Sequence, residues 1–249
     1  SRNIENLNLR NIELKYLGNG KEPISLGYLE GNEFTITIRN LNDDEIKKIK
    51  KAEKKKFNVP NLFGPQRFSK NNHLVGKSII KKDFKKAVEL ILENTGYAEE
   101  EIKNYLKDKR NDYAGALRLI PLKTRKLFIH AYQSFLFNKI VEDYLKNSNK
   151  NKVENIKIPL TGFNFELKSI KNIKIKKIFQ KILEEEKLNP RDFIISQIPE
   201  LTSEGGFRNL FFELKFGILE TGKDELNENR QKAKIRFILP KSCYATVAL

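Results

Sequence analysis

The string Gly31-Asn32-Glu33-Phe34 places a side-chain amide two residues before an aromatic ring. Such a pair can hold a flat heterocyclic base, because the ring offers a stacking plane and the amide offers an edge contact. A second interpretation is purely local. Gly-Asn suits a tight turn between strands at 26–29 and 34–38, and Phe34 then packs in a core. The rest of the chain is needed to choose between the two.

Four further strings combine aromatic and basic residues, and the first two also contain amides: NLFGPQRF at 61–68, HAYQSFLFN at 130–138, GGFR at 205–208 and LPKSCYAT at 239–246. Gln66, Arg67 and Lys241 are candidate contacts to a phosphate-bearing ligand, although Arg67 could equally brace its own loop. Arg208 could reach such a ligand or form a structural salt bridge. Each string by itself is a weak signal.

The HAYQSFLFN string falls in a long stretch, 124–145, whose apolar residues recur every three or four positions, which predicts an amphipathic helix. In this helix Gln133 and Asn138 are expected to order contacts with neighbouring segments. His130 is expected to be a packed, hydrogen-bonded residue rather than a base. The aromatic residues of the string are expected in the core: Tyr132, Phe135 and Phe137.

Charge is the strongest feature of the composition. The chain has 48 basic and 32 acidic residues among 249, a net charge of +16. An excess of this size favours a polyanionic partner, most simply a nucleic acid. The alternative is a lysine-rich, well-solvated surface of the kind found in hyperthermophile proteins. That alternative explains the large number of charged residues but not the excess of basic over acidic ones.

Several classes of function are disfavoured. One cysteine and two histidines make a structural zinc site improbable, and no metal or cofactor is expected. The phosphate-loop, nucleophile-elbow and HExxH patterns are missing from the sequence. No apolar run approaches the ~18 residues of a membrane span. We therefore expect a cytoplasmic protein without a membrane segment.

The order of predicted elements indicates an insertion. Alternating patterns near both ends predict strands, at 12–17, 34–38, 209–218 and 233–239, with a last strand from 244 onward. Helices are predicted between them, at 46–57, 83–92, 99–106, 124–145 and 172–187. This arrangement predicts an α+β fold. Residues 1–57 and 210–249 form one sheet domain, and 58–209 form a mainly helical insert.

Taken in chain order, the strings GNEF, FGPQRF, HAYQSFLFN, GGFR and KSCYAT resemble the TruD family of tRNA pseudouridine synthases, in its archaeal form. The resemblance implies a catalytic domain with a mixed or antiparallel sheet, interrupted by the inserted TRUD domain. It implies tRNA as substrate, with uridine 13 as the modified position, and no cofactor. It implies that Phe34 stacks on the target uracil and that Asn32 shapes the site. Ser69 stands where the family usually has glycine.

The family uses one essential aspartate, in a Gly-x-Lys-Asp string upstream of GNEF. Residues 1–31 contain no aspartate, and Lys107-Asp108-Lys109-Arg110 is a superficial match inside the predicted insert. We therefore expect no catalytic residue in this chain, an aspartate upstream of Ser1, and no activity from this chain alone. The alternative is a non-catalytic, basic RNA-binding module on the same scaffold.

Overall fold

The computed structural model describes residues 10, 14–16, 18, 20, 28–93, 98–148 and 154–249. The chain divides into two compact units, Ser1–Glu30 and Gly31–Leu249, and the helices and strands of the described residues lie in the second. The strands expected at 12–17 and 26–29 lie partly outside the described residues. The described residues of both ranges, 14–16, 28 and 29, are not in a strand.

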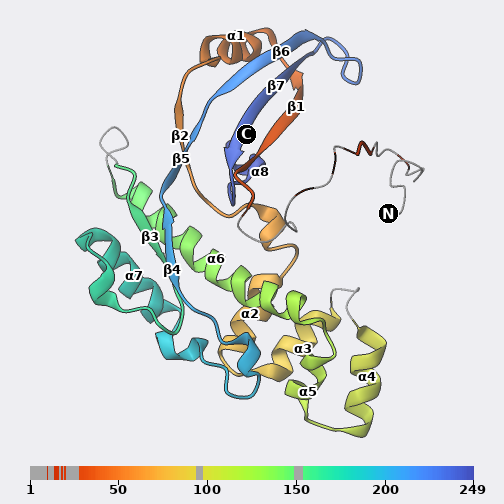
Figure 1. The fold of residues 1–249 in the computed structure, drawn as a ribbon, viewed down its shortest axis with the longest axis vertical. Helices are drawn as coiled ribbons and strands as arrows, with labels where there is room; N and C mark the ends of the chain where they lie inside the picture. The colour runs from red at the N-terminus through yellow and green to blue at the C-terminus, as the bar shows by residue number, and fades with distance from the viewer. Residues whose placement is uncertain are drawn as a thin grey trace. The chain divides into compact units, whose positions relative to one another are not determined.

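Three antiparallel strands form the main sheet, with the last strand in the middle (Figure 1). The order is β1 (Gly31–Leu41), β7 (Gln231–Pro240) and β6 (Phe216–Lys223). The strands expected at 34–38 and 233–239 are therefore confirmed. The sheet joins residues from the two ends of the unit, which are about 200 positions apart.

Gly31 and Asn32 do not form the expected turn. Both belong to β1, where Gly31 pairs with Pro240 and Asn32 pairs with Leu239. A Cβ atom on Gly31 would lie 2.4 Å from the Leu239 carbonyl oxygen. Glycine is needed here because the neighbouring strand approaches closely, not because the backbone reverses direction.

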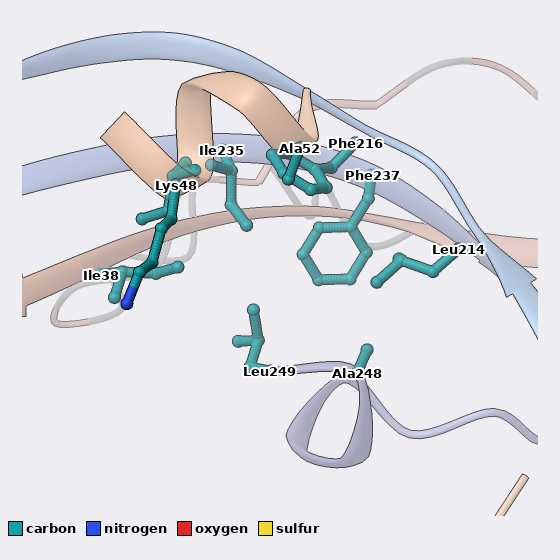
Figure 2. Close-up of a pocket in the computed structure, with 10 residues that line it drawn as sticks. Ile38, Lys48, Ala52, Leu214, Phe216, Ile235, Phe237, Ala248 and Leu249 are labelled. Carbon is teal, nitrogen blue, oxygen red and sulfur yellow. The ribbon is translucent and has the colours of Figure 1, made fainter. Parts of the chain in front are cut away.

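One face of the sheet is apolar, as the alternation in β1 predicted. Helix α1 (Asp43–Ala52) and helix α8 (Ala245–Ala248) pack on this face. Between them and the sheet lies a pocket of about 260 Å³, shown in Figure 2. The pocket lining is apolar except for Lys48, so it offers no pattern of polar groups that would recognise a base. The lining residues are Ile38, Lys48, Ile49, Ala52, Leu214, Phe216, Ile235, Phe237, Ala248 and Leu249.

Helix α1 begins as predicted and ends early. Asn42 and Glu45 form a capping box, in which each side chain accepts the other's backbone N–H at 2.9 and 2.8 Å. The helix was expected to reach Phe57, but it ends at Ala52, and Lys54 has a left-handed φ of 63°. A longer helix would place Lys54 and Lys55 one turn beyond Lys50 and Lys51, and like charges at that spacing disfavour continuing the helix.

The C-terminal residues form a helical turn instead of the expected strand. Backbone N–H groups of Val247 and Ala248 bond the Tyr244 carbonyl, and Leu249 bonds Ala245. Alanine has the highest helix propensity, and no neighbouring strand is positioned to pair with this segment among the described residues. The prediction of a strand here is wrong.

Two short antiparallel ribbons connect the sheet to the helices (Figure 1). In the first, β2 (Phe57–Pro60) pairs with β5 (Phe211–Leu214). In the second, β3 (Lys157–Leu160) pairs with β4 (Gly206–Asn209). The strand expected at 209–218 is thus divided, because β5 ends before Lys215 and β6 begins after it.

The middle of the chain is helical, as predicted. Its elements are η2 (Pro65–Arg67), α2 (Asn72–Ile80), α3 (Phe84–Leu92), α4 (Glu99–Asp108), α5 (Tyr113–Arg118), α6 (Leu122–Lys146), η4 (Leu167–Ser169), α7 (Ile173–Glu185), η5 (Pro190–Phe193) and η6 (Pro199–Leu201). The long helix α6 packs against α2, α7 and β3, and supplies much of a core that is separate from that of the sheet. No helix in the described ranges is long and apolar enough to cross a bilayer.

A buried carboxylate ties the helices together. Glu186, which follows α7, accepts hydrogen bonds from Lys77 Nζ at 2.7 Å, Tyr132 Oη at 2.9 Å and Lys139 Nζ at 3.1 Å. Its side chain is only 10% exposed. Burial alone would raise the pKa of Glu186, but these hydrogen bonds outweigh it and lower the pKa to about 2. The network therefore joins α2, α6 and α7 through one charge.

Candidate functional site

Asn32 and Phe34 lie at the end of β1 that is next to the C-terminal end of β7. The Asn32 side chain is exposed, and the Phe34 ring is partly buried. Phe34 stacks on Phe237 with ring centroids 5.6 Å apart and planes at 25°. The ring therefore uses one surface for the core and keeps another accessible. This geometry suits both the stacking role and the core role considered for Phe34.

The segment that follows β7, residues 241–246 (the C-terminal segment), lies against η2. Arg67 Nε donates to Tyr244 Oη at 3.2 Å, and Thr246 Oγ1 donates to Gln66 Oε1 at 3.0 Å. A Cβ atom on Gly64 would lie 2.8 Å from both Tyr244 and Thr246. The glycine of the FGPQRF string thus permits this close approach.

Arg208, in β4, joins the same segment to the start of the helical part. Its Nε donates to the Asn61 carbonyl at 2.9 Å, and its Nη2 donates to the Ser242 carbonyl at 2.7 Å and to Asn61 Oδ1. Its guanidinium carbon lies 4.4 Å from the centroid of the Phe63 ring. These partners are neutral, so the salt bridge considered for Arg208 is not formed with any described carboxylate.

Phe63 is held in place by the long helix. Its backbone N–H donates to Asn138 Oδ1 at 2.9 Å, and Asn138 Nδ2 donates to the Phe63 carbonyl at 3.0 Å. The Phe63 ring also meets Phe137 edge-on at 5.4 Å. The sequence assigned no role to Phe63 or Asn61, although the amide of Asn138 was recognised as a contact-forming group.

The other residues of the HAYQSFLFN string are placed largely as predicted. Tyr132 and Phe137 are fully buried. Gln133 Nε2 donates to the carbonyls of Thr161 at 2.6 Å and Glu204 at 2.9 Å, so it fastens the β3–β4 ribbon to α6. His130 is exposed, contrary to expectation, because it lies on the outer side of the helix.

Positive charge gathers on the outer side of α6 next to η2. Although His130 is exposed, the side chains around its ring desolvate it enough to lower its pKa, and the charges of Arg67 and Lys126 lower the pKa further. Lys241 is exposed at the start of the C-terminal segment, one residue beyond β7. The sequence-predicted residues Gln66, Arg67 and Arg208 are therefore brought to one region, which continues into Lys241 and the end of β7.

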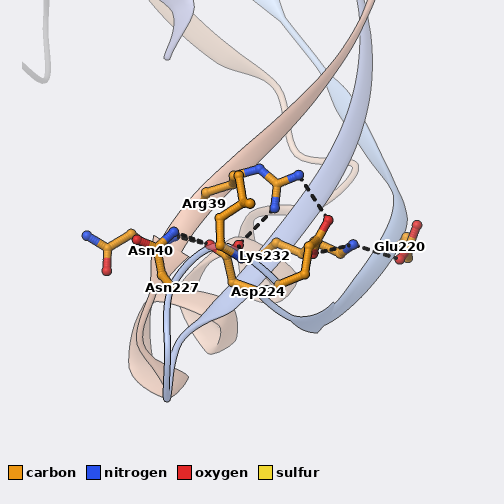
Figure 3. Close-up of polar contacts among 8 residues, drawn as sticks. Arg39, Asn40, Glu220, Asp224, Asn227 and Lys232 are labelled. Carbon is orange, nitrogen blue, oxygen red and sulfur yellow. Dashed lines mark hydrogen bonds and ion pairs between the residues drawn. The ribbon is translucent and has the colours of Figure 1, made fainter.

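The conspicuous buried aspartate of the sheet lies elsewhere. Asp224, in the β6–β7 connection, accepts hydrogen bonds from Arg39 Nη1, Asn40 N and Asn227 Nδ2, each at 2.8 Å (Figure 3). Burial would raise the pKa of Asp224, but its hydrogen bonds prevail and lower it. Arg39 is near the opposite end of β1 from Asn32, so this carboxylate fixes the hairpin to the strand.

Two further acids are also poorly placed for chemistry at Phe34. Glu33 alternates to the other face of β1 and pairs with Arg236 at 3.6 Å. Asp108 is the exposed last residue of α4, which lies at the opposite end of this unit from the sheet (Figure 1). Within the described residues, no three His, Cys, Asp or Glu side chains gather as a metal site would require.

The family model for tRNA pseudouridine synthase D (TruD) matches residues 1–103, 96–155 and 146–249. This chain belongs to the tRNA pseudouridine synthase D family. The strings that carried the resemblance, from GNEF to KSCYAT, lie in β1, η2, α6, β4 and the C-terminal segment. Ser69, where the family usually has glycine, has a left-handed φ of 47°, the conformation that glycine adopts at least cost.

Relatives named tRNA pseudouridine synthase D come from archaea. One from Methanosarcina acetivorans is 31% identical, covering 99% of this chain and 73% of the relative. One from Thermococcus sibiricus is 30% identical, covering 98% of this chain and 73% of the relative. A crystal structure from Methanosarcina mazei described as TruD has a TM-score of 0.74 and 28% identity, and it covers 98% of this chain and 73% of that one. These agreements confirm the α+β fold.

The relatives are longer within the matched span as well. The alignment with the Methanosarcina acetivorans protein runs over 328 positions, whereas this chain has 249 residues. The family model matches in three parts that meet near 96–103 and 146–155.

Proposed function

We propose that this chain is the greater part of an RNA uridine isomerase that forms pseudouridine in tRNA. The observation that carries the proposal is the convergence of the family strings at one end of the sheet. Asn32 is exposed and Phe34 is partly exposed there beside β7, and the C-terminal segment leads directly from β7 to Gln66, Arg67 and Arg208. The modified position is uridine 13 by family resemblance.

Asn32 and Phe34 would receive a uracil that has been flipped out of the RNA stack. The accessible part of the Phe34 ring offers a plane for the base, and the exposed Asn32 amide offers a donor and an acceptor for its edge. The reaction breaks the bond from ribose C1′ to uracil N1 and forms a bond from C1′ to uracil C5. C5 loses its proton and N1 gains one. It is an isomerisation with no net redox change, so a carboxylate suffices and no cofactor is needed.

The carboxylate is proposed to be an aspartate upstream of Ser1, as the family pattern indicates. The test measures pseudouridine formation on unmodified tRNA by this chain and by a longer form that includes the coding sequence upstream. We expect product from the longer form only. Pseudouridine formed by this chain would mean that one of its own acidic residues is the catalytic carboxylate. Asp108 would then be the first residue to substitute.

The absence of aspartate from residues 1–31 also favours a second candidate, a non-catalytic RNA-binding module. This module would bind tRNA with the same surface but leave uridine unchanged. Tight tRNA binding without product from either form would favour it over the isomerase.

The proposed division into domains follows the ribbons. Residues 1–57 and 210–249 would form part of the catalytic domain, and 58–209 the inserted TRUD domain. The ribbon of β2 and β5 supports this, because it brings the two proposed crossing points side by side. The separate cores of the sheet and the helices support it as well. As a tRNA-modifying enzyme the protein would act in the cytoplasm.

RNA affinity should depend steeply on salt. Gln66, Arg67, Arg208 and Lys241 are the proposed RNA contacts, within a chain of net charge +16. Each phosphate neutralised contributes roughly 0.7 to 0.9 to the negative slope of log K against log salt. We expect a slope of several units for unmodified tRNA in filter-binding or fluorescence titrations from low to moderate salt. A flat response would contradict the phosphate contacts.

A further inference from the structure

Two arginines share one aromatic ring in the proposed RNA-binding region. The guanidinium carbons of Arg208 and Arg67 lie 4.4 and 5.6 Å from the centroid of the Phe63 ring. Both distances are within the range of a cation–π contact. The ring itself cannot move freely, because Asn138 binds its backbone on both sides and Phe137 packs against its edge. Phe63 is thus a fixed platform for two positive charges.

Neither charge is compensated by a described carboxylate. No described Asp or Glu lies within 4.0 Å of either guanidinium, whereas Arg39, Arg125 and Arg236 each pair with one. Arg208 is also partly desolvated: burial lowers its pKa, and the Arg67 charge contributes in the same direction. Holding two like charges close together in a partly buried place costs free energy. An anion placed between or beside them would recover that cost.

The two arginines differ in which of their guanidinium nitrogens are already hydrogen-bonded. Arg208 uses Nε and Nη2 on Asn61 and Ser242, so it is committed to holding the chain. Arg67 uses Nε on the Tyr244 hydroxyl. Its two terminal amino groups have no hydrogen-bond partner among the described residues. A terminal pair of this kind matches two oxygens of one phosphate.

We propose that Arg67 binds a backbone phosphate of the RNA strand that carries the target uridine, and that Arg208 is the positioning residue that holds Phe63 and the C-terminal segment for it. This inference rests on the proposed function and deepens it. The location is suitable, because Tyr244 is four residues beyond Pro240, which pairs with Gly31. Four residues span at most about 14 Å, so the phosphate would lie within a few nucleotides of the base at Phe34.

The test is the affinity of unmodified tRNA for Arg67→Gln across a salt series, which requires no catalysis. We expect about tenfold weaker binding at low salt and a salt slope smaller by roughly one phosphate contact. Arg67→Lys keeps the charge but loses the two-point geometry, and should keep the slope while losing part of the affinity. Phe63→Leu keeps all charges but removes the platform, and should weaken binding several-fold.

The matched control is Arg110→Gln, which removes the same charge from an exposed position between α4 and α5. Equal weakening and equal slopes for Arg67→Gln and Arg110→Gln would overturn the inference, because net charge alone would then explain binding. Unaltered binding by Phe63→Leu would overturn the role of the platform. Thermal unfolding of each variant excludes loss of the fold.

The result is separable from the proposed function. An Arg67-specific slope change with no pseudouridine from either form would uphold the phosphate site and reject the isomerase. Pseudouridine formation with equal slopes in both glutamine variants would uphold the isomerase and reject the phosphate site.

Discussion

Replacing Phe34 with alanine should slow pseudouridine formation by about 10- to 100-fold while tRNA affinity changes by less than about threefold, given a stacking free energy of ~1–3 kcal/mol per base. The reason is that the flipped base is the only part of the RNA that the ring would contact, whereas most of the affinity comes from phosphate contacts spread over the surface. The measurement is a single-turnover rate at saturating enzyme, beside an equilibrium titration, with the form of the protein that makes pseudouridine.

The matched control is Ile36→Ala. Ile36 is on the same strand and face as Phe34, is similarly half-buried and belongs to the same apolar cluster, but it lies two residues farther from Asn32. Both substitutions should lower the stability of the sheet. Only Phe34→Ala should slow the reaction selectively. Equal slowing by both variants, or parallel loss of rate and affinity in Phe34→Ala, would show that the ring acts through the core.

Local sequence signals predicted the starts of α1 and α3 and the extent of α6 well, because those signals are complete within a few residues. Asn42 and Glu45 form the capping box that their spacing allows, and Asp83 caps α3 by accepting the Lys86 N–H at 3.0 Å. The periodicity of 124–145 predicted α6 to within two residues at each end. In each case the interacting groups are neighbours in sequence, so pattern and structure agree.

The wrong predictions for Gly31, Asn32 and the C-terminal residues concern segments whose structure depends on residues distant in the sequence. Gly31 and Asn32 carry the composition of a turn, but the same glycine also suits a strand that meets a neighbour closely, and that neighbour is Leu239. The C-terminal residues from 244 onward alternate weakly and form a helical turn. Nothing local to Gly31 and Asn32 distinguishes a turn from a strand. At the C-terminus the helix propensity of alanine prevails because no strand of the described residues pairs with the segment.

The candidate site also contains features that local sequence predicts and features that depend on contacts between distant residues. Family strings identified Gln66, Arg67 and Arg208, yet their arrangement depends on contacts that no local pattern contains. Arg208 reaches Ser242, and Asn138 reaches Phe63 across 75 positions. Sequence could therefore name candidate residues for the region, whereas the separation of roles between Arg67 and Arg208 required knowing which of their nitrogen atoms are already engaged.

Substituting Glu186 with glutamine should cost the largest share of stability among conservative single changes in the helical part. The carboxylate is 10% exposed and accepts from two lysines and the Tyr132 hydroxyl. Glutamine keeps an acceptor but removes the charge that Lys77 and Lys139 face. We expect a loss of about 2–3 kcal/mol in the free energy of unfolding at pH 7, measured by urea denaturation.

The loss of stability in Glu186→Gln should depend on pH. The pKa of Glu186 is about 2 in the folded protein, below the ~4.3 of an unfolded chain. Its contribution is therefore complete above about pH 5 and is lost as pH falls from there toward 2. The difference between wild type and Glu186→Gln should shrink over that range. Glu185→Gln is the control, because exposed Glu185 also pairs with Lys139, at 3.5 Å, yet lies outside the buried network. A constant difference between wild type and Glu186→Gln down to pH 3 would show that the carboxylate is not held ionised by its partners.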